Sequence, residues 1–176
     1  IRSASTDDIS DIAQFNIAMA QETEERQLDP ETIQSGVSGV IQNHVHGFYL
    51  IAERDRVAIG SLLITFEWSD WRNGTLWWIQ SVYVKPEHRR TGIFKALYDA
   101  VIARARAAKS VRGIRLYVEQ ENLDAQSVYQ KLSMQKNDQY ILVLLMGILI
   151  LLAVEVKQVL LLVCLPCRLV NLPVLA

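Results

Sequence analysis

One stretch of this sequence, HRRTGIFKALY from His88 to Tyr98, constrains the fold more than any other. It lies between a run rich in β-branched and aromatic residues, 75–84, and a segment whose apolar residues recur at helical spacing up to residue 105. The expected order is therefore strand, basic loop, glycine and helix. The free N–H groups at the start of such a helix favour an anion, and Gly92 lets a ligand approach the backbone closely.

The two arginines of the loop leave two interpretations open. Arg89 and Arg90 could add charge-assisted contacts to a bound phosphate, or they could be solvated side chains in an ordinary strand-to-helix turn. The spacing matches neither a P-loop nor the Gly-x-Gly-x-x-Gly dinucleotide fingerprint. A net charge of −1 gives no general reason to expect nucleic acid, so any anion site should be local.

The other hydrophobic patterns predict an α/β (α+β) fold with a mixed sheet. Predicted helices cover residues 7–20, 30–42, 94–105 and 122–132, and predicted strands cover 48–53, 58–68, 75–84, 113–119 and 139–145. Asp29 and Pro30 should cap and open the second helix. Turns are expected at 54–56 and at Asn73-Gly74.

The basic loop resembles the acetyl-CoA pyrophosphate loop of the GNAT N-acetyltransferase superfamily. That loop has Arg or Gln, two residues, Gly, one residue, and then Gly or Ala. Arg89 and Gly92 match the pattern, whereas Phe94 stands where a small residue is expected. Asn122 to Tyr129 resembles the family's Asn-x-x-Ala-x-x-x-Tyr element, and the resemblance covers residues 1–145.

The resemblance implies a mixed, mostly antiparallel central sheet with a splayed strand pair and helices on both faces. It also implies acetyl-CoA as cosubstrate, with no metal. The implied contacts are Val82, Tyr83 and Val84 for the pantetheine arm, Arg89, Arg90, Thr91, Gly92, Ile93 and Phe94 for the pyrophosphate, Asn122 near the cofactor and Tyr129 near the sulfur.

Direct acetyl transfer to a primary amine, on a small molecule or an amino group, needs a neutral nitrogen and a proton for the leaving thiolate. Tyr129 is expected to be the general acid. We favour Glu67 as the base over Asp70 and Glu24, although Glu67 could equally be a surface strand residue. A non-catalytic acyl-CoA-binding module remains an alternative function.

All four tryptophans fall between Glu67 and Trp78. Trp68, Asp70 and Trp71 could hold an amine by cation–π contact and ion pairing. Trp77 and Trp78 are adjacent on a strand and point to opposite faces, so at least one of them should be core.

The composition changes near residue 140, beyond which only Glu155, Lys157 and Arg168 are charged. We therefore expect a domain at 1–145 and an apolar tail at 146–176. The apolar run 141–154 is shorter than the ~20 residues that cross a bilayer. The tail could be a membrane-associating segment, a homodimer contact or non-native sequence, and we favour the last two.

The remaining expectations concern metals, partners and compartment. His44 and His46 lack a third ligand, and Cys164 and Cys167 lack a second pair, so no metal site is expected. The expected partner is a small-molecule amine, with neither nucleic acid nor a membrane. In the absence of a secretory leader pattern we expect a cytoplasmic protein.

Overall fold

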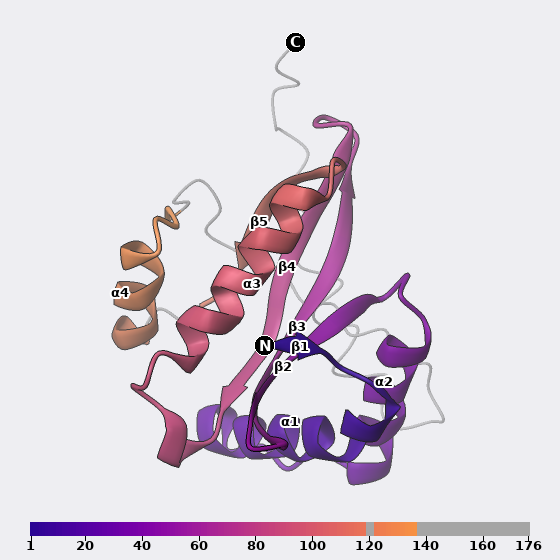
Figure 1. Ribbon diagram of the computed structural model, residues 1–176, viewed down its shortest axis with the longest axis vertical. Coiled ribbons are helices and arrows are strands. Elements are labelled where there is room, and N and C mark those ends of the chain that lie inside the picture. Colours follow the sequence, from indigo (N-terminus) through magenta and orange to yellow (C-terminus); the bar gives the residue numbers. More distant parts are fainter. Residues whose placement is uncertain (119–121, 137–176) are drawn as a thin grey trace, which may run out of the picture. The chain divides into compact units, whose positions relative to one another are not determined.

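A five-stranded sheet forms the centre of the computed structural model, which describes residues 1–118 and 122–136. The strands are β1 (Arg2–Ser3), β2 (Gly47–Arg54), β3 (Val57–Ser69), β4 (Gly74–Val84) and β5 (Val111–Leu116). They lie in sequence order; β1 to β4 pair antiparallel, and β5 runs parallel to β4 (Figure 1). The predicted mixed, mostly antiparallel sheet is confirmed.

Four α-helices accompany the sheet in the described part of the chain: α1 (Ile9–Glu24), α2 (Pro30–Gln42), α3 (Ile93–Ala107) and α4 (Leu123–Lys131), with short 3-10 turns η1 (Thr6–Asp8) and η2 (Pro86–His88). The start of α2 is as predicted, because the Asp29 carboxylate accepts the Thr32 N–H at 2.8 Å. The end of α1 was predicted wrongly at residue 20. Gln and Glu favour helix, so α1 continues to Glu24 and ends where Glu25 turns left-handed at φ 51°.

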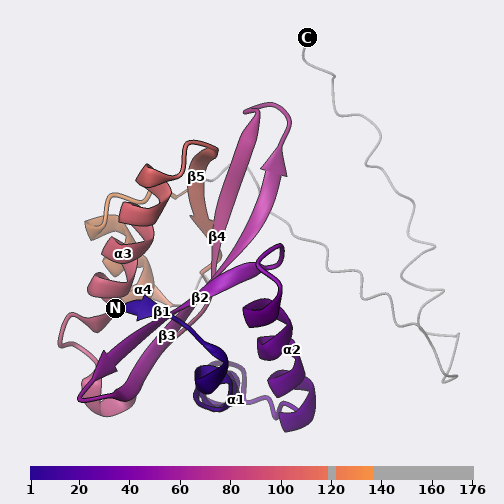
Figure 2. The ribbon, with the colours of Figure 1, turned by 45° about the vertical axis from the view of Figure 1, so that its right-hand side comes forward.

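Helices cover both faces of the sheet, as predicted (Figure 2). On one face, Asn16 of α1 lies 3.5 Å from the Tyr49 hydroxyl of β2. On the other face, the guanidinium of Arg104 in α3 lies 5.5 Å from the Phe48 ring centroid. The core on the α1 and α2 side consists of Ile12, Phe15, Val37, Tyr49, Ile51, Ala58 and Tyr83.

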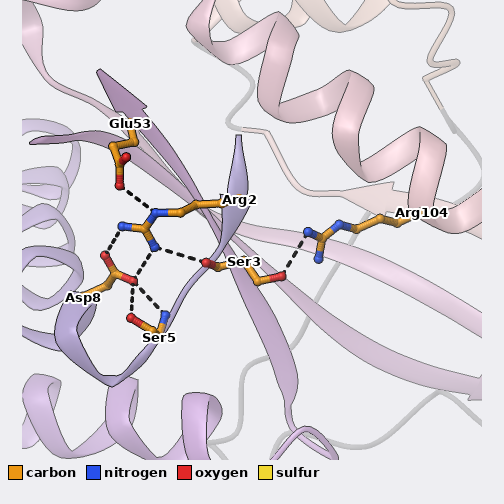
Figure 3. A network of polar contacts seen from close by, with 6 residues as sticks. All are labelled: Arg2, Ser3, Ser5, Asp8, Glu53 and Arg104. Atoms are coloured by element: carbon orange, nitrogen blue, oxygen red, sulfur yellow. Dashed lines mark hydrogen bonds and ion pairs between the residues drawn. The ribbon is translucent and has the colours of Figure 1, made fainter. Parts of the chain in front are cut away.

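Side-chain contacts add to the short backbone ladder that pairs the two-residue strand β1 with β2 (Figure 3). The Arg2 guanidinium donates to both carboxylate oxygens of Asp8 and to Glu53, each at 2.7 Å. The Arg104 guanidinium donates to the Ser3 hydroxyl at 3.0 Å. These contacts join β1 to η1, β2 and α3, and they fix the edge of the sheet.

Strands β4 and β5 separate part of the way along. β5 pairs with β4 only from Thr75 to Ile79, where Leu116 is the last partner. On its other edge β4 stays paired with β3 to Val84, although the register shifts, so that residues 80 and 81 stand opposite Leu63 alone. β5 therefore ends at Leu116 rather than at the predicted residue 119, because β4 has diverged from it.

The structure leaves several predictions untested. The strand at 139–145, the tail at 146–176 and the Cys164–Cys167 pair lie outside the described residues. Within the described residues, no helix has the length and apolar character needed to cross a membrane. The chain divides into two compact units, Ile1–Val128 and Tyr129–Ala176, so all the strands and α1 to α3 belong to the first.

Candidate active site

The open edge of β4 beyond Ile79 is the first component of the site. The Lys85 N–H donates to the Ile59 carbonyl of β3 at 2.9 Å. The N–H and C=O groups of successive residues point to alternate sides of a strand. Those of Val84 and Val82 therefore point away from β3, toward the edge of β4 where β5 no longer pairs. No strand in the described part of the chain pairs with that edge. An extended ligand can add there through backbone hydrogen bonds.

The start of α3 is the second component. Arg90 (φ 62°) and Gly92 (φ 85°) are both left-handed and turn the chain from η2 into the helix. A Cβ on Gly92 would meet no described atom within 4 Å, so the space before the helix is open. Glycine is needed here for its positive φ rather than to avoid a steric clash. No described side chain caps α3. Its first N–H groups can therefore bind an anion.

The Arg89 side chain is exposed, but hydrogen bonds to two other segments fix its orientation. Its Nε donates to the Val84 carbonyl at 2.8 Å, and its Nη2 donates to Glu22 of α1 at 2.6 Å. Glu22 also accepts a 3.2 Å hydrogen bond from the Tyr83 hydroxyl, and the Arg89 guanidinium lies 5.5 Å from the Tyr83 ring centroid. Burial, together with the Glu22 charge, raises the pKa of Tyr83. Sequence analysis did not identify Glu22.

Two other loop side chains support the turn. The Thr91 hydroxyl donates to the His88 carbonyl at 2.7 Å. The Phe94 ring is half-buried, and its centroid lies 6.3 Å from that of Tyr98, one turn further along α3. The bulky residue at the position where the family pattern has a small one thus contacts its own helix.

Glu67 lies in a polar and aromatic cluster on the sheet. Its carboxylate accepts hydrogen bonds from the Trp78 indole N–H and from Arg115, the latter at 3.4 Å. Both carboxylate oxygens are therefore engaged. Trp77, pointing to the opposite face, is only 8% exposed, which confirms that one of the paired tryptophans belongs to the core.

Trp68, Asp70 and Trp71 lie at the hairpin between the end of β3 at Ser69 and the start of β4 at Gly74. The Asp70 carboxylate accepts the Trp71 N–H at 2.8 Å, and Trp68 and Trp71 are 63% and 88% exposed. β4 runs from this hairpin to Val84, roughly 33 Å away at ~3.3 Å per residue. The structure therefore does not bring these three residues to the start of α3.

Asn122 has a local structural role in α4. Its side-chain oxygen accepts the Ala125 N–H at 3.0 Å, an N-cap that accounts for the Asn-x-x-Ala spacing. Tyr129 follows Asn122 by seven residues, about two helical turns. Burial raises the pKa of the Tyr129 phenol. In the described residues, no three His, Cys, Asp or Glu side chains gather as a metal site would require.

Comparisons with family models and with solved structures both match acetyltransferases. A family model described as Acetyltransferase (GNAT) family matches residues 11–134. A structure described as a possible acetyltransferase from Clostridium difficile 630 is 37% identical, with a TM-score of 0.77, covering 83% of this chain and 96% of its own. A search of curated protein sequences gave no match.

Two more distant structures share the fold. A protein described as a predicted acetyltransferase from Clostridium acetobutylicum, solved with acetyl-CoA, is 20% identical with a TM-score of 0.67, covering 81% of this chain and 93% of its own. A ribosomal-protein-alanine N-acetyltransferase from Brucella melitensis biovar Abortus 2308 is 18% identical with a TM-score of 0.66, covering 83% and 97%.

Proposed function

The chain belongs to the acetyltransferase (GNAT) family, and from this premise we propose that it transfers the acetyl group of acetyl-CoA to a primary amine of a small molecule. One observation carries the proposal: the edge of β4 that no described strand pairs with leads directly, through η2, to the start of α3, which no described side chain caps. An extended arm joined to a pyrophosphate has the shape and charge for that pair of sites.

In the proposed complex the pyrophosphate binds the N–H groups from Gly92 to Phe94, with Arg90 adding positive charge. The pantetheine arm lies along Val82 and Val84. The Val84 carbonyl is already occupied by Arg89, so the arm uses the Val84 N–H and the backbone of Val82. The thioester then lies near the bulge at residues 80 and 81. The acetyl-CoA in the Clostridium acetobutylicum structure supports this choice of ligand.

The chemistry is a direct attack of the neutral amine on the thioester carbonyl. A C–N bond forms, the C–S bond breaks, one amine proton leaves and the CoA thiolate gains a proton. Tyr129 donates that proton in this proposal. Its raised pKa keeps the phenol protonated through neutral pH, as a general acid must be. Glu67 receives the amine proton, directly or through water.

Two measurements on the full chain test the proposal. Calorimetric titration should show acetyl-CoA binding, and thiol release with a panel of primary amines should show turnover. Binding without turnover of any amine would indicate a non-catalytic acyl-CoA-binding module instead. Failure to bind acetyl-CoA would refute the proposed function.

Replacing Tyr129 by Phe tests the acid separately. The variant should keep its affinity for acetyl-CoA and lose about 100-fold in kcat, since general acid catalysis typically contributes on that order. Unchanged kcat in Tyr129→Phe would remove the acid and leave the acetyl transfer itself intact.

A further inference from the structure

A cluster of four side chains lies on one face of the sheet where β3, β4 and β5 adjoin. Trp78 pairs with Arg115 across the β4–β5 ladder, so their side chains project from the same face. The Arg115 guanidinium lies 5.5 Å from the Trp78 ring centroid. The Trp78 and Tyr117 rings are 4.6 Å apart and inclined at 33°. Glu67 of β3 is the fourth member of the cluster, because its carboxylate accepts hydrogen bonds from both Trp78 and Arg115.

This face is the one that α1 packs against. Tyr49, which contacts α1, pairs with Leu63 on β3, so both side chains point to the α1 face. Every second residue of a strand points to the same face, so Glu67 points to that face as well. Tyr117 is 67% exposed and Trp78 is half-buried, so α1 leaves this part of the face accessible.

The cluster lies beside the point where the strands part. Ile79 and Leu116 form the last β4–β5 pair, and Trp78 and Arg115 form the pair before it. At ~3.3 Å per residue, Arg115 is about 7 Å along the strands from the first open position at residue 80. Under the proposed function the thioester carbonyl reaches that position, so the cluster flanks the path of the acceptor amine.

Arg115 has the chemistry to bind an anionic group. Its contact with Glu67 uses one of five guanidinium donors, at the long distance of 3.4 Å, and its side chain is 41% exposed. The guanidinium remains charged at all relevant pH values and suits bidentate carboxylate recognition. Glu67 and the Trp78 ring fix its orientation in advance, which lowers the entropic cost of binding.

We propose that Arg115 binds the carboxylate of the acceptor, and that the acceptor is a small amino acid whose amine lies a few bonds from this carboxylate. The inference rests on the proposed function. The side chain of the amino acid packs against the Trp78 and Tyr117 rings, while its amine points toward the thioester. The amine forms the new C–N bond as the thioester C–S bond breaks, one amine proton is released, and the CoA thiolate takes up a proton and leaves as the thiol.

The test uses the full chain with acetyl-CoA and two matched acceptor series, the twenty proteinogenic amino acids and their carboxamides. Thiol release gives kcat/KM for each pair. A carboxamide also changes the basicity of the amine, so a single ratio is not sufficient. For each enzyme we divide kcat/KM for the amino acid by kcat/KM for its carboxamide. The deciding quantity is this acid-to-amide ratio in the wild type divided by the same ratio in Arg115→Gln. We expect this quotient to be on the order of tenfold or more, carried by KM.

Two further variants keep the result interpretable. Arg115→Lys retains the charge without the planar fork and should fall between wild type and Arg115→Gln. Arg106→Gln makes the same change on the exposed last turn of α3 and should leave the ratio unchanged. Thermal unfolding of each variant reports whether it folds.

Three outcomes would overturn the inference. The first is a quotient near one, as when Arg115→Gln slows acids and amides equally through a structural effect. The second is that the protein binds acetyl-CoA but acetylates no amino acid, and instead acetylates other amines or only the N-termini of peptides. Absence of acetyl-CoA binding would instead refute the proposed function and the inference together.

Discussion

The carboxylate of Glu22 lies 2.6 Å from the guanidinium of Arg89, across 67 residues of sequence. Glu22 lies in the last turn of α1, whereas Arg89 belongs to the loop between β4 and α3. The same arginine donates to the Val84 carbonyl, so a single side chain connects α1, β4 and the loop. Arg89 is thereby oriented by the protein, and we propose that its main effect on a bound pyrophosphate is to hold the loop backbone in place.

Replacing Glu22 by Gln should weaken acetyl-CoA binding about threefold, because an exposed ion pair contributes on the order of 0.6 kcal/mol and its loss lets the loop move. Calorimetric titration measures the change, with Glu25→Gln as a control of equal charge at the end of the same helix. Tighter binding in Glu22→Gln would show instead that Arg89 contacts the phosphates directly and that Glu22 competes for it.

Gly92→Ala should impair ligand binding more than folding. The left-handed backbone costs alanine about 1 kcal/mol, and its methyl group enters the open space where the pyrophosphate is proposed to bind. We expect acetyl-CoA affinity to fall at least tenfold while the unfolding free energy falls by only about 1 kcal/mol. Titration and denaturant unfolding give the two values.

Gly36→Ala provides the matched control for Gly92→Ala. Gly36 lies within α2, and a Cβ there also meets no described atom within 4 Å. Alanine should stabilise this helix by about 0.5–1 kcal/mol without altering acetyl-CoA affinity. An equal loss of affinity in both variants would contradict an anion site at Gly92.

The features that were predictable from sequence depend on neighbours along the chain. The Asp29 cap and the glycine that opens α3 are local patterns, and both are present as predicted. The contact between Glu22 and Arg89 depends on how α1 crosses the sheet, which no periodicity encodes. The early end of β5 at Leu116 likewise follows from the divergence of β4.

The same distinction applies to the candidate site residues. Proximity in the sequence grouped Trp68 and Trp71 with Glu67. Adjacent strand residues point to opposite faces, so Trp68 points away from Glu67, whose carboxylate contacts Arg115 on β5. Arg115 could have been noticed as the charged residue on the alternating strand 113–119. Its pairing with Trp78 required the parallel register, which sequence patterns do not specify.

Asp8→Asn should destabilise the protein by about 2 kcal/mol at neutral pH, because it removes the charge that pairs with Arg2 and joins β1 to η1. The Arg2 guanidinium lowers the pKa of Asp8. A lowered folded pKa gives stability that is present above the unfolded value of ~3.9 and is lost as the pH falls through the folded value.

The difference between wild type and Asp8→Asn should therefore be constant near neutrality and shrink below about pH 4. Denaturant unfolding across pH 2.5 to 7 measures it. Asp7→Asn, at the exposed neighbouring carboxylate, should have little effect at any pH. A difference between wild type and Asp8→Asn that persists unchanged at pH 2.5 would show that the Asp8 charge is not its source.

Glu67→Gln separates the two roles that the structure allows for this carboxylate. As the base, Glu67 must accept the amine proton, and Gln cannot, so kcat should fall on the order of 100-fold. If Glu67 only positions Arg115, replacing it by Gln should raise KM for carboxylate-bearing acceptors and leave kcat unchanged. The Gln amide oxygen can still accept from the Trp78 indole, so the cluster keeps its packing.

Arg115→Gln is the complementary variant for Glu67→Gln, because it breaks the same ion pair and keeps the carboxylate. We expect Glu67→Gln to act mainly on kcat and Arg115→Gln mainly on KM, measured by thiol release under saturating acetyl-CoA. If both variants raise KM alone, Glu67 serves only to position Arg115, and the base must be another group or water. The ion pair would then contribute to acceptor selection rather than to proton transfer.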